Sequence, residues 1–175
     1  PGENAVIPFT EGDGDYTVVG YQQIQGDQYA ALYSEILTVE LENDFLPFLY
    51  PNQYVNFSPD SEASKLALSM VSEDTTDVDA LKQIYNYVVN NLTYDYDKAE
   101  TVETGYLPDV DETLSTKTGI CFDYAALTTA MLRSCDIPCK LQIGYTGDIK
   151  HAWIDVYIRS KGWVTGAVSF NGDSW

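Results

Sequence analysis

Apolar residues recur at intervals of three and four positions in three segments of the first half of the chain, and this spacing predicts helices. The first segment covers residues 27–37. The second begins with Ser58 as a helix N-cap and Pro59 at the first helical position. The third covers residues 76–92, where Thr76 stands three positions before an acidic residue, as in a capping box. The third segment therefore has the strongest helix signal.

The second half of the chain combines one helical segment with three runs that have strand character. The helical pattern starts directly after Cys121 and ends before Pro138. A short apolar run over 141–145 follows, and then a strict alternation over 151–158 and a returning run over 163–170. Turn signals separate these runs, so we expect a helix followed by strands that are joined by hairpins.

Two segments have no sustained period. Residues 1–26 are polar and rich in turn signals, apart from a strand-like run from Tyr16 to Val19, and we interpret them as an N-terminal arm. Residues 94–115 carry seven acidic side chains, and we interpret them as a long acidic loop. Long loops in compact domains are usually functional or disordered.

Length and composition limit the class of protein. The 175 residues predict one domain, with or without a smaller appendage, and the apolar content of 45% is sufficient for a packed core. The 27 acidic and 9 basic residues give a net charge of -18. A field of this sign repels phosphate backbones, so we expect no binding to nucleic acid. No apolar run approaches the roughly 20 residues that span a bilayer.

Cys121 combines features that are typical of a catalytic thiol. It stands at the start of a predicted helix, where the helix dipole favours a thiolate and backbone N–H groups can line an oxyanion site. His151, the one histidine of the sequence, begins the alternating run downstream. Such a pair can act as nucleophile and general base when the fold brings the two together. The alternative is a buried thiol and an unrelated histidine.

The stretch TGICFDYAALTTAMLRSCDIPCKLQIGY, followed by HAWIDVYI, resembles the core of the transglutaminase-like superfamily. The shared pattern is G-x-C at a helix start, a helix that ends before I-P-x, then G-Y, and H-A-W on the next strand. The resemblance implies an α+β, papain-like fold in which the cysteine begins a central helix packed on an antiparallel sheet. It also implies that Cys121 is the nucleophile and His151 the general base.

The resemblance also divides the chain. It covers residues 76–175 and leaves residues 1–75 as an N-terminal arm and helical segment. The family's third catalytic residue is an aspartate of a D-P-T segment on the strand after H-A-W, where it orients the imidazole. In the family a tryptophan precedes the D-P-T segment. If this tryptophan is Trp163, Ala167 occupies the position of the aspartate; if it is Trp175, the aspartate falls after the last residue of the sequence. We favour the second alignment and therefore expect a core that is truncated at its C-terminus.

Two other aspartates of the sequence are candidates for the third catalytic role. Asp173 is retained as a substitute. Asp155 shares a strand face with His151, but about 13 Å of strand separates the two residues, which is too far for it to orient the ring.

The resemblance implies acyl transfer on a protein or peptide substrate. The thiolate of Cys121 attacks a peptide or carboxamide carbonyl, and His151 protonates the departing amine, so that a thioester forms. We expect hydrolysis by a protease or amidase rather than cross-linking, because transfer to an amine requires a site that excludes water. The alternative is a catalytically inactive binding module on a secreted or cell-surface protein, which Ala167 would favour. No cofactor is expected, and the oligomeric state stays open.

The three cysteines and the histidine also allow a zinc site as a rival interpretation. The spacing of Cys121, Cys135, Cys139 and His151 lacks the two-residue knuckle that is common in structural zinc sites, so we expect no metal. Cys135 and Cys139 are expected to be free thiols rather than a disulfide. The acidity of the chain favours an extracellular or cell-surface location.

Overall fold

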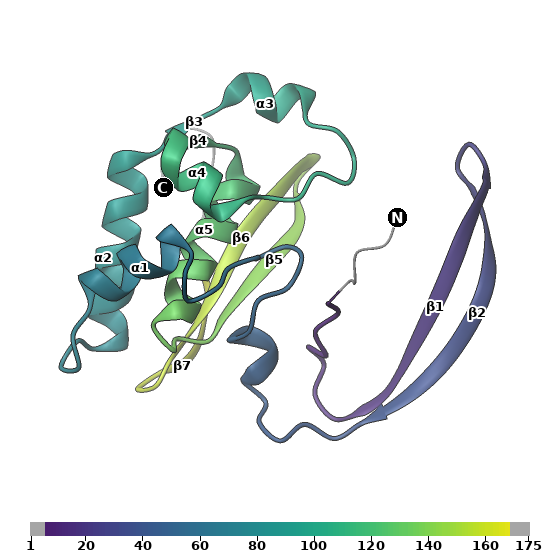
Figure 1. Cartoon of the computed structure of the whole chain (residues 1–175), viewed down its shortest axis with the longest axis horizontal. Helices are drawn as coiled ribbons and strands as arrows, with labels where there is room; N and C mark the ends of the chain where they lie inside the picture. Colours follow the sequence, from purple (N-terminus) through teal and green to yellow (C-terminus); the bar gives the residue numbers. More distant parts are fainter. Residues whose placement is uncertain (1–5, 169–175) are drawn as a thin grey trace. The chain divides into compact units, whose positions relative to one another are not determined.

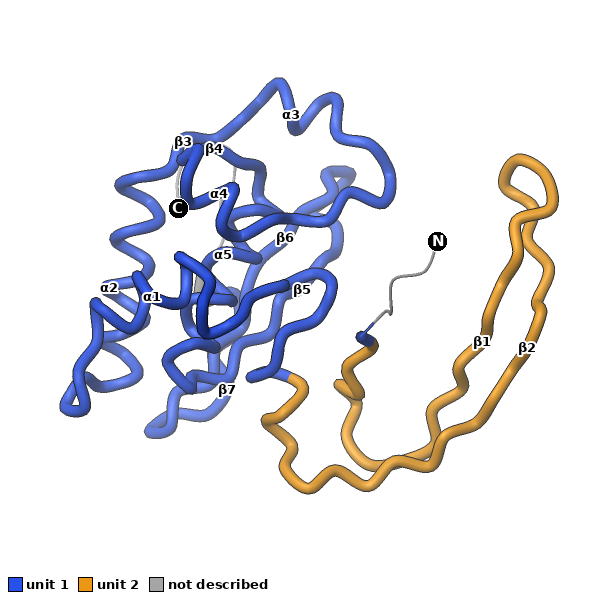
Figure 2. Tube along the Cα trace, viewed as in Figure 1, with its two compact units in different colours: residues 1–6, 48–175 blue, residues 7–47 orange. Residues whose placement is uncertain are grey.

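The computed structural model describes residues 6–168, which form two compact units (Figure 1). One unit is Ile7–Pro47, and the other contains the chain from Phe48 onward together with the segment before Ile7 (Figure 2). The division expected from the sequence, with a boundary between residues 75 and 76, stays a prediction about domain organisation.

The unit Ile7–Pro47 contains a long antiparallel hairpin of β1 (Gly14–Gln25) and β2 (Gln28–Val39). Gly26, with a φ of 52°, lies in the two-residue turn between the strands, where the left-handed backbone favours glycine. The helix predicted over 27–37 is therefore wrong. The backbone hydrogen bonds of this segment are made with β1, so the segment is stable as a strand. The spacing of apolar residues within the segment carries no information about this pairing partner. The apolar side chains that matched a helical stripe are exposed: Tyr29, Leu32, Tyr33 and Ile36.

The second unit contains five helices and five strands among its described residues. After the short 3₁₀ helix η1 (Leu46–Phe48) come α1 (Glu62–Met70), α2 (Asp77–Asn91), β3 (Thr93–Tyr94), α3 (Tyr96–Thr101), α4 (Val110–Thr116), β4 (Thr118–Gly119), α5 (Cys121–Ser134), β5 (Cys139–Thr146), β6 (Ile149–Ile158) and β7 (Gly162–Val168).

Helix α5 is the centre of this unit. It packs against β5 and β6 of a three-stranded antiparallel sheet with the order β5-β6-β7, and α1, α2 and α4 pack on it as well (Figure 1). Its residues from Asp123 to Arg133 are all buried. The inward residues of β6 close the core from the sheet side, as their alternation predicted: Ala152, Ile154, Val156 and Ile158. The expected α+β fold, with Cys121 at the start of a central helix on an antiparallel sheet, is confirmed.

Polar residues with short side chains mark the points at which α1 and α2 begin. Thr76 is confirmed as the N-cap of α2, because the Asp79 N–H donates to Thr76 Oγ1 at 3.2 Å, and that hydroxyl donates to the Asp79 carboxylate at 2.7 Å. The predicted start of α1 is early by a few residues. Ser58 instead forms a turn in which its hydroxyl accepts the Asp60 N–H, and the helix begins after Ser61.

The acidic loop predicted over 94–115 is also wrong in part, since it contains the end of β3, all of α3 and most of α4. Two of its acidic residues serve as helix N-caps. Asp95 accepts the Lys98 N–H at 2.9 Å and begins α3, and Asp109 accepts two N–H groups of α4. Each helix has only one or two turns, so no apolar period can develop in the sequence.

An ion pair joins the start of α2 to the β6–β7 hairpin. Asp77 is 8% exposed and accepts hydrogen bonds from the Arg159 guanidinium at 2.5–3.0 Å and from the Arg159 N–H at 2.9 Å. The guanidinium hydrogen bonds hold the pKa of Asp77 below its ordinary value of 3.8. The carboxylate form is therefore favoured in the folded chain.

We expect Asp77→Asn to lower the free energy of unfolding at pH 7 by about 1–3 kcal/mol, because hydrogen bonds to a charged group are lost. A lowered pKa stabilises the fold above the ordinary value of 3.8, and this stabilisation disappears as the pH falls through the lowered pKa. Urea denaturation at pH 7 and pH 3 measures the effect. Glu62→Gln, which removes the exposed pair with Lys65, is the control and should cost less than about 1 kcal/mol. Equal losses in the two variants would contradict the assignment.

Candidate active site

Cys121 is the first residue of α5 and follows the N-cap Ile120, whose backbone is extended. The thiol is half-buried and lies at the positive end of the helix dipole. The Ile120 N–H donates to the Asp123 carboxylate at 2.8 Å, so a side chain of the first turn satisfies a backbone donor at the helix start. Local capping thus fixes the point at which the helix begins and the thiol is presented.

The glycine of the G-x-C motif has a steric reason. Gly119 belongs to β4 and pairs in parallel with Tyr94 of β3. A Cβ atom at Gly119 would lie 2.6 Å from the Asp123 Cβ, which is closer than real Cβ atoms approach. Only glycine therefore allows the chain to pass the buried Asp123 on its way to Cys121.

His151 lies on β6, opposite Gly144 of β5, and its ring stacks on Trp153 with centroids 6.2 Å apart. Burial lowers the pKa of His151 below its ordinary value of 6.5. The imidazole is therefore neutral at pH 7 and able to accept a proton.

Cys121 and His151 line the same cavity, which has a volume of about 260 Å³. The helix start supplies the thiol and the sheet supplies the imidazole, so packing of α5 on β6 brings together two residues that are distant in sequence. Further walls come from the segment 99–106 and from both strands of the β5–β6 hairpin near its turn. The arrangement has the parts that nucleophilic catalysis by a thiol needs.

Tyr94 is a residue of the same cavity that the sequence did not reveal. The parallel pairing of β3 with β4 places Tyr94 opposite Gly119, two residues before Cys121. The pKa of Tyr94 is raised, mainly by burial and then by the neighbouring Cys121. Since the β3–β4 bridge has only two residues on each strand, no periodic pattern marks it in the sequence.

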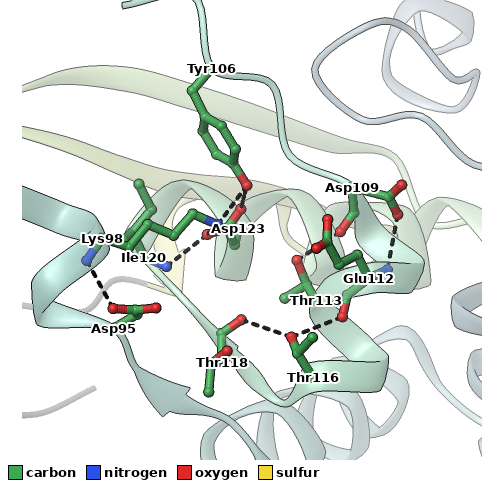
Figure 3. A network of polar contacts seen from close by, with 10 residues as sticks. All are labelled: Asp95, Lys98, Tyr106, Asp109, Glu112, Thr113, Thr116, Thr118, Ile120 and Asp123. Atoms are coloured by element: carbon green, nitrogen blue, oxygen red, sulfur yellow. Dashed lines mark hydrogen bonds and ion pairs between the residues drawn. The ribbon is translucent and has the colours of Figure 1, made fainter. Parts of the chain in front are cut away.

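A polar network is centred on Asp123 in the first turn of α5 (Figure 3). Asp123 is fully buried and accepts hydrogen bonds from the Tyr106 hydroxyl, from Lys98 Nζ at 2.8 Å and from the Ile120 N–H. Lys98 Nζ also donates to the Tyr106 hydroxyl at 2.7 Å and lies 4.4 Å from the centroid of that ring. The network joins α3, the loop after it and the first turn of α5.

The pKa values of the network follow from burial and charge. Burial, and then the hydrogen bond to Asp123, raises the pKa of Tyr106 to about 12. Burial is the largest influence on Lys98 and lowers its pKa, but the hydrogen bonds to Asp123 and Tyr106 outweigh it, and the pKa of Lys98 is raised. Lys98 is therefore charged and Tyr106 neutral at pH 7, which makes both of them donors to Asp123.

Asp155, a candidate for the third catalytic role, has hydrogen-bond partners on β5 and β7. Asp155 accepts hydrogen bonds from the Gln142 side chain at 3.1 Å and from the Gly166 N–H at 2.8 Å. Asp173 lies outside the described residues, as does any aspartate after Trp175. The orienting group of His151 stays a prediction.

The other two cysteines lie away from this cavity as free thiols. Burial raises the pKa of Cys135 to about 11 and that of Cys139, whose thiol donates to Thr129 Oγ1, to about 12. Within residues 6–168, no three His, Cys, Asp or Glu side chains gather in a way that would hold a metal ion, so the zinc alternative gains no support. Over the same range, no helix has the length and apolar character needed to cross a membrane.

Comparison with known proteins gives two sequence relatives, and the chain spans a quarter or less of the length of each. The uncharacterized protein YebA of Bacillus subtilis (strain 168) is 24% identical over 183 residues, which cover 91% of this chain and 25% of YebA. The UPF0252 protein MJ1282 of Methanocaldococcus jannaschii is 40% identical over 62 residues, which cover 33% of this chain and 18% of that protein.

Solved structures of similar fold include two bacterial proteins. A protein from Cytophaga hutchinsonii to which a cysteine protease activity is ascribed superposes with a TM-score of 0.56 at 19% identity, over 93% of this chain and 67% of that one. The periplasmic domain of TgpA from Pseudomonas aeruginosa superposes with a TM-score of 0.50 at 18% identity, over 63% of this chain and 43% of that one. At these identities the likeness concerns the fold alone.

The family comparison is more extensive. The sequence model of the transglutaminase-like superfamily matches residues 64–166, which is more than half of the chain and includes most of α1, all of α2, the Cys121 helix and the His151 strand. The chain belongs to the transglutaminase-like superfamily.

Proposed function

We propose that the chain catalyses acyl transfer from a peptide or carboxamide substrate through a thioester on Cys121, with His151 as general base and acid. The observation that carries this proposal is the shared cavity of a thiol at a helix N-terminus and a neutral imidazole. The superfamily and the C. hutchinsonii protein of similar fold support it. We keep an aspartate at or after position 173 as the expected orienting residue of His151.

The proposed reaction has two halves. His151 takes the proton of the Cys121 thiol while the sulfur attacks the carbonyl carbon, and it then gives that proton to the departing amine as the C–N bond breaks. Water attacks the resulting thioester, with His151 again accepting a proton. The carboxylic acid leaves, and the Cys121 thiol is restored.

The oxyanion of the tetrahedral intermediate requires hydrogen-bond donors. The Cys121 N–H at the helix start is one, since it has no partner within the helix and its hydrogen bond to Tyr94 can be replaced by one to the oxyanion. The Tyr94 hydroxyl is a second, because its ring lines the cavity and its pKa responds to the Cys121 thiol at close range. This hydroxyl is neutral at pH 7 and thus carries a proton to donate.

Hydrolysis is favoured over transfer to an amine because solvent has access to the cavity. Ile143 and Ile149, which form part of its wall, are 44% and 72% exposed. A thioester at Cys121 would therefore meet water readily, whereas efficient amine transfer needs water to be excluded.

We also propose an extracellular, periplasmic or cell-surface location. The net charge of -18 is compatible with it, and the fold is similar to that of the periplasmic TgpA domain.

A peptide library incubated with the chain and cadaverine tests the reaction. Mass spectrometry should show hydrolysed peptides or carboxamides in excess over cadaverine adducts, and Cys121→Ala should give neither. Adducts without hydrolysis would refute the hydrolytic assignment. Complete absence of products, with Cys121 no more reactive than Cys135 and Cys139, would instead favour the inactive binding module.

A further inference from the structure

The cavity beside Cys121 has an apolar wall on two sides. Val102 and Tyr106 of the segment 99–106 contribute to one side, and Ile143 and Ile149 of the β5–β6 hairpin contribute to the other. Phe122 follows Cys121 and packs edge-on against the Tyr106 ring, with centroids 6.3 Å apart. An apolar surface therefore begins directly at the thiol.

The size of the cavity suits a single side chain. Its volume is about 260 Å³, and an apolar protein cavity of about 150 Å³ is already large enough to hold a benzene ring. A leucine, methionine or phenylalanine side chain would thus fit, with room left for the adjoining backbone.

The charged residues of the lining do not oppose this use. Apart from His151, they are Glu103 and Lys150 among the described residues, and their opposite charges favour neither an anionic nor a cationic side chain. The lining of the cavity therefore does not share the strong net negative charge of the whole chain.

We infer that this cavity is the binding site for one apolar side chain of the substrate, aliphatic or aromatic, which lies next to the carbonyl attacked by Cys121. The inference rests on the proposed function for the orientation of the substrate. The apolar preference of the cavity stands on the lining residues alone.

The wall formed by residues 99–106 depends on the Asp123 network. Helix α3, which leads into the wall, has no buried residue, so apolar packing contributes little to its position. Lys98 directly precedes this segment and Tyr106 ends it, and both donate to the fully buried Asp123. Lys98 and Tyr106 are accordingly positioning residues that hold the wall against the first turn of α5.

Binding to the full chain with Cys121→Ala tests the apolar preference without any reaction. N-acetyl-phenylalaninamide should bind at least about tenfold more tightly than N-acetyl-glycinamide in an NMR titration, because the ring is buried. Ile143→Asp in the same background should remove most of this preference. Equal affinities, or tighter binding of N-acetyl-aspartic acid α-amide, would overturn the inference.

Tyr106→Phe in this background tests the positioning role, since the ring stays in the wall and only the hydrogen bonds of its hydroxyl with Asp123 and Lys98 are lost. The preference for the phenylalanine amide should fall several-fold. Tyr145→Phe is the matched control on an exposed tyrosine and should keep the full preference. A full preference in Tyr106→Phe would refute the positioning role.

The buried Cys139 reports whether these variants remain folded, because its thiol is protected from iodoacetamide in the native chain. If Tyr106→Phe exposes Cys139, then Lys98→Met, which keeps its aliphatic stem, gives the same test. The result is separable from the proposed function. Apolar binding with an unreactive Cys121 would refute only the reaction, whereas a reactive Cys121 without apolar preference would refute only the binding site.

Discussion

Iodoacetamide at pH 6 is expected to alkylate Cys121 at least about 100-fold faster than Cys135 or Cys139, because only thiolates react appreciably. Burial raises the pKa of Cys135 to about 11 and that of Cys139 to about 12. At pH 6 these two thiols are thus ionised to only about one part in 10⁵ and 10⁶. Cys121 differs from both, since it lies half-buried at a helix N-terminus in a cavity that it shares with a histidine.

The pH is chosen for the state of His151. Burial lowers its pKa below 6.5, so that the neutral imidazole, which accepts the proton of the thiol, persists to lower pH than in an exposed histidine. The acid limb of the labelling rate should accordingly lie below pH 6.5. Peptide mapping by mass spectrometry follows the three cysteines in one sample.

His151→Ala should reduce the labelling of Cys121 to the rate of an ordinary accessible thiol while leaving that of Cys135 and Cys139 unchanged. The unchanged rates are the internal control for folding. Equal and slow labelling of all three cysteines in the wild-type chain would refute an activated thiol. An unchanged Cys121 rate in His151→Ala would refute the role of the imidazole alone.

The elements around the candidate site were predictable where the sequence carries a local signal. The alternation of β6 and the apolar stripe of α2 can be recognised in the sequence, because buried and exposed residues follow one another at the period of a strand and of a helix, respectively. The hairpin β1–β2 was not predictable in the same way. The apolar residues of β2 are exposed along most of the strand, so burial, the usual source of period two, is absent.

The candidate site shows the same division. Cys121 and His151 belong to short contiguous motifs, and their roles were expected from these motifs. Tyr94 and the pair of Lys98 with Tyr106 have no such motif, because their partners at the start of α5 lie far along the chain. The sequence did not indicate that the Asp123 carboxylate is buried, because an acidic residue in the first turn of a helix is ordinarily exposed.

Asp123→Asn is expected to lower the free energy of unfolding by about 2–4 kcal/mol. The side chain is fully buried, and its charge balances Lys98, of which 32% is exposed. Removing one partner of a buried pair leaves the other charge without compensation, which costs about 3–5 kcal/mol when both are buried. The partial exposure of Lys98 places the expected loss toward the lower end. The amide NH₂ of an asparagine would also face groups that donate hydrogen bonds to Asp123, and it cannot accept them.

A double-mutant cycle with Lys98→Met isolates this interaction. Lys98→Met alone leaves the buried Asp123 charge without its cation and should also cost a few kcal/mol, about 2–4. The double variant should cost less than the sum of the single variants by about 1–3 kcal/mol, because the second substitution removes an interaction that is already lost. Urea denaturation at pH 7 measures all four proteins. Additive losses would contradict the direct coupling of Lys98 to Asp123. A coupling of this size would mean that the segment which walls the cavity stabilises the first turn of α5, where Cys121 lies.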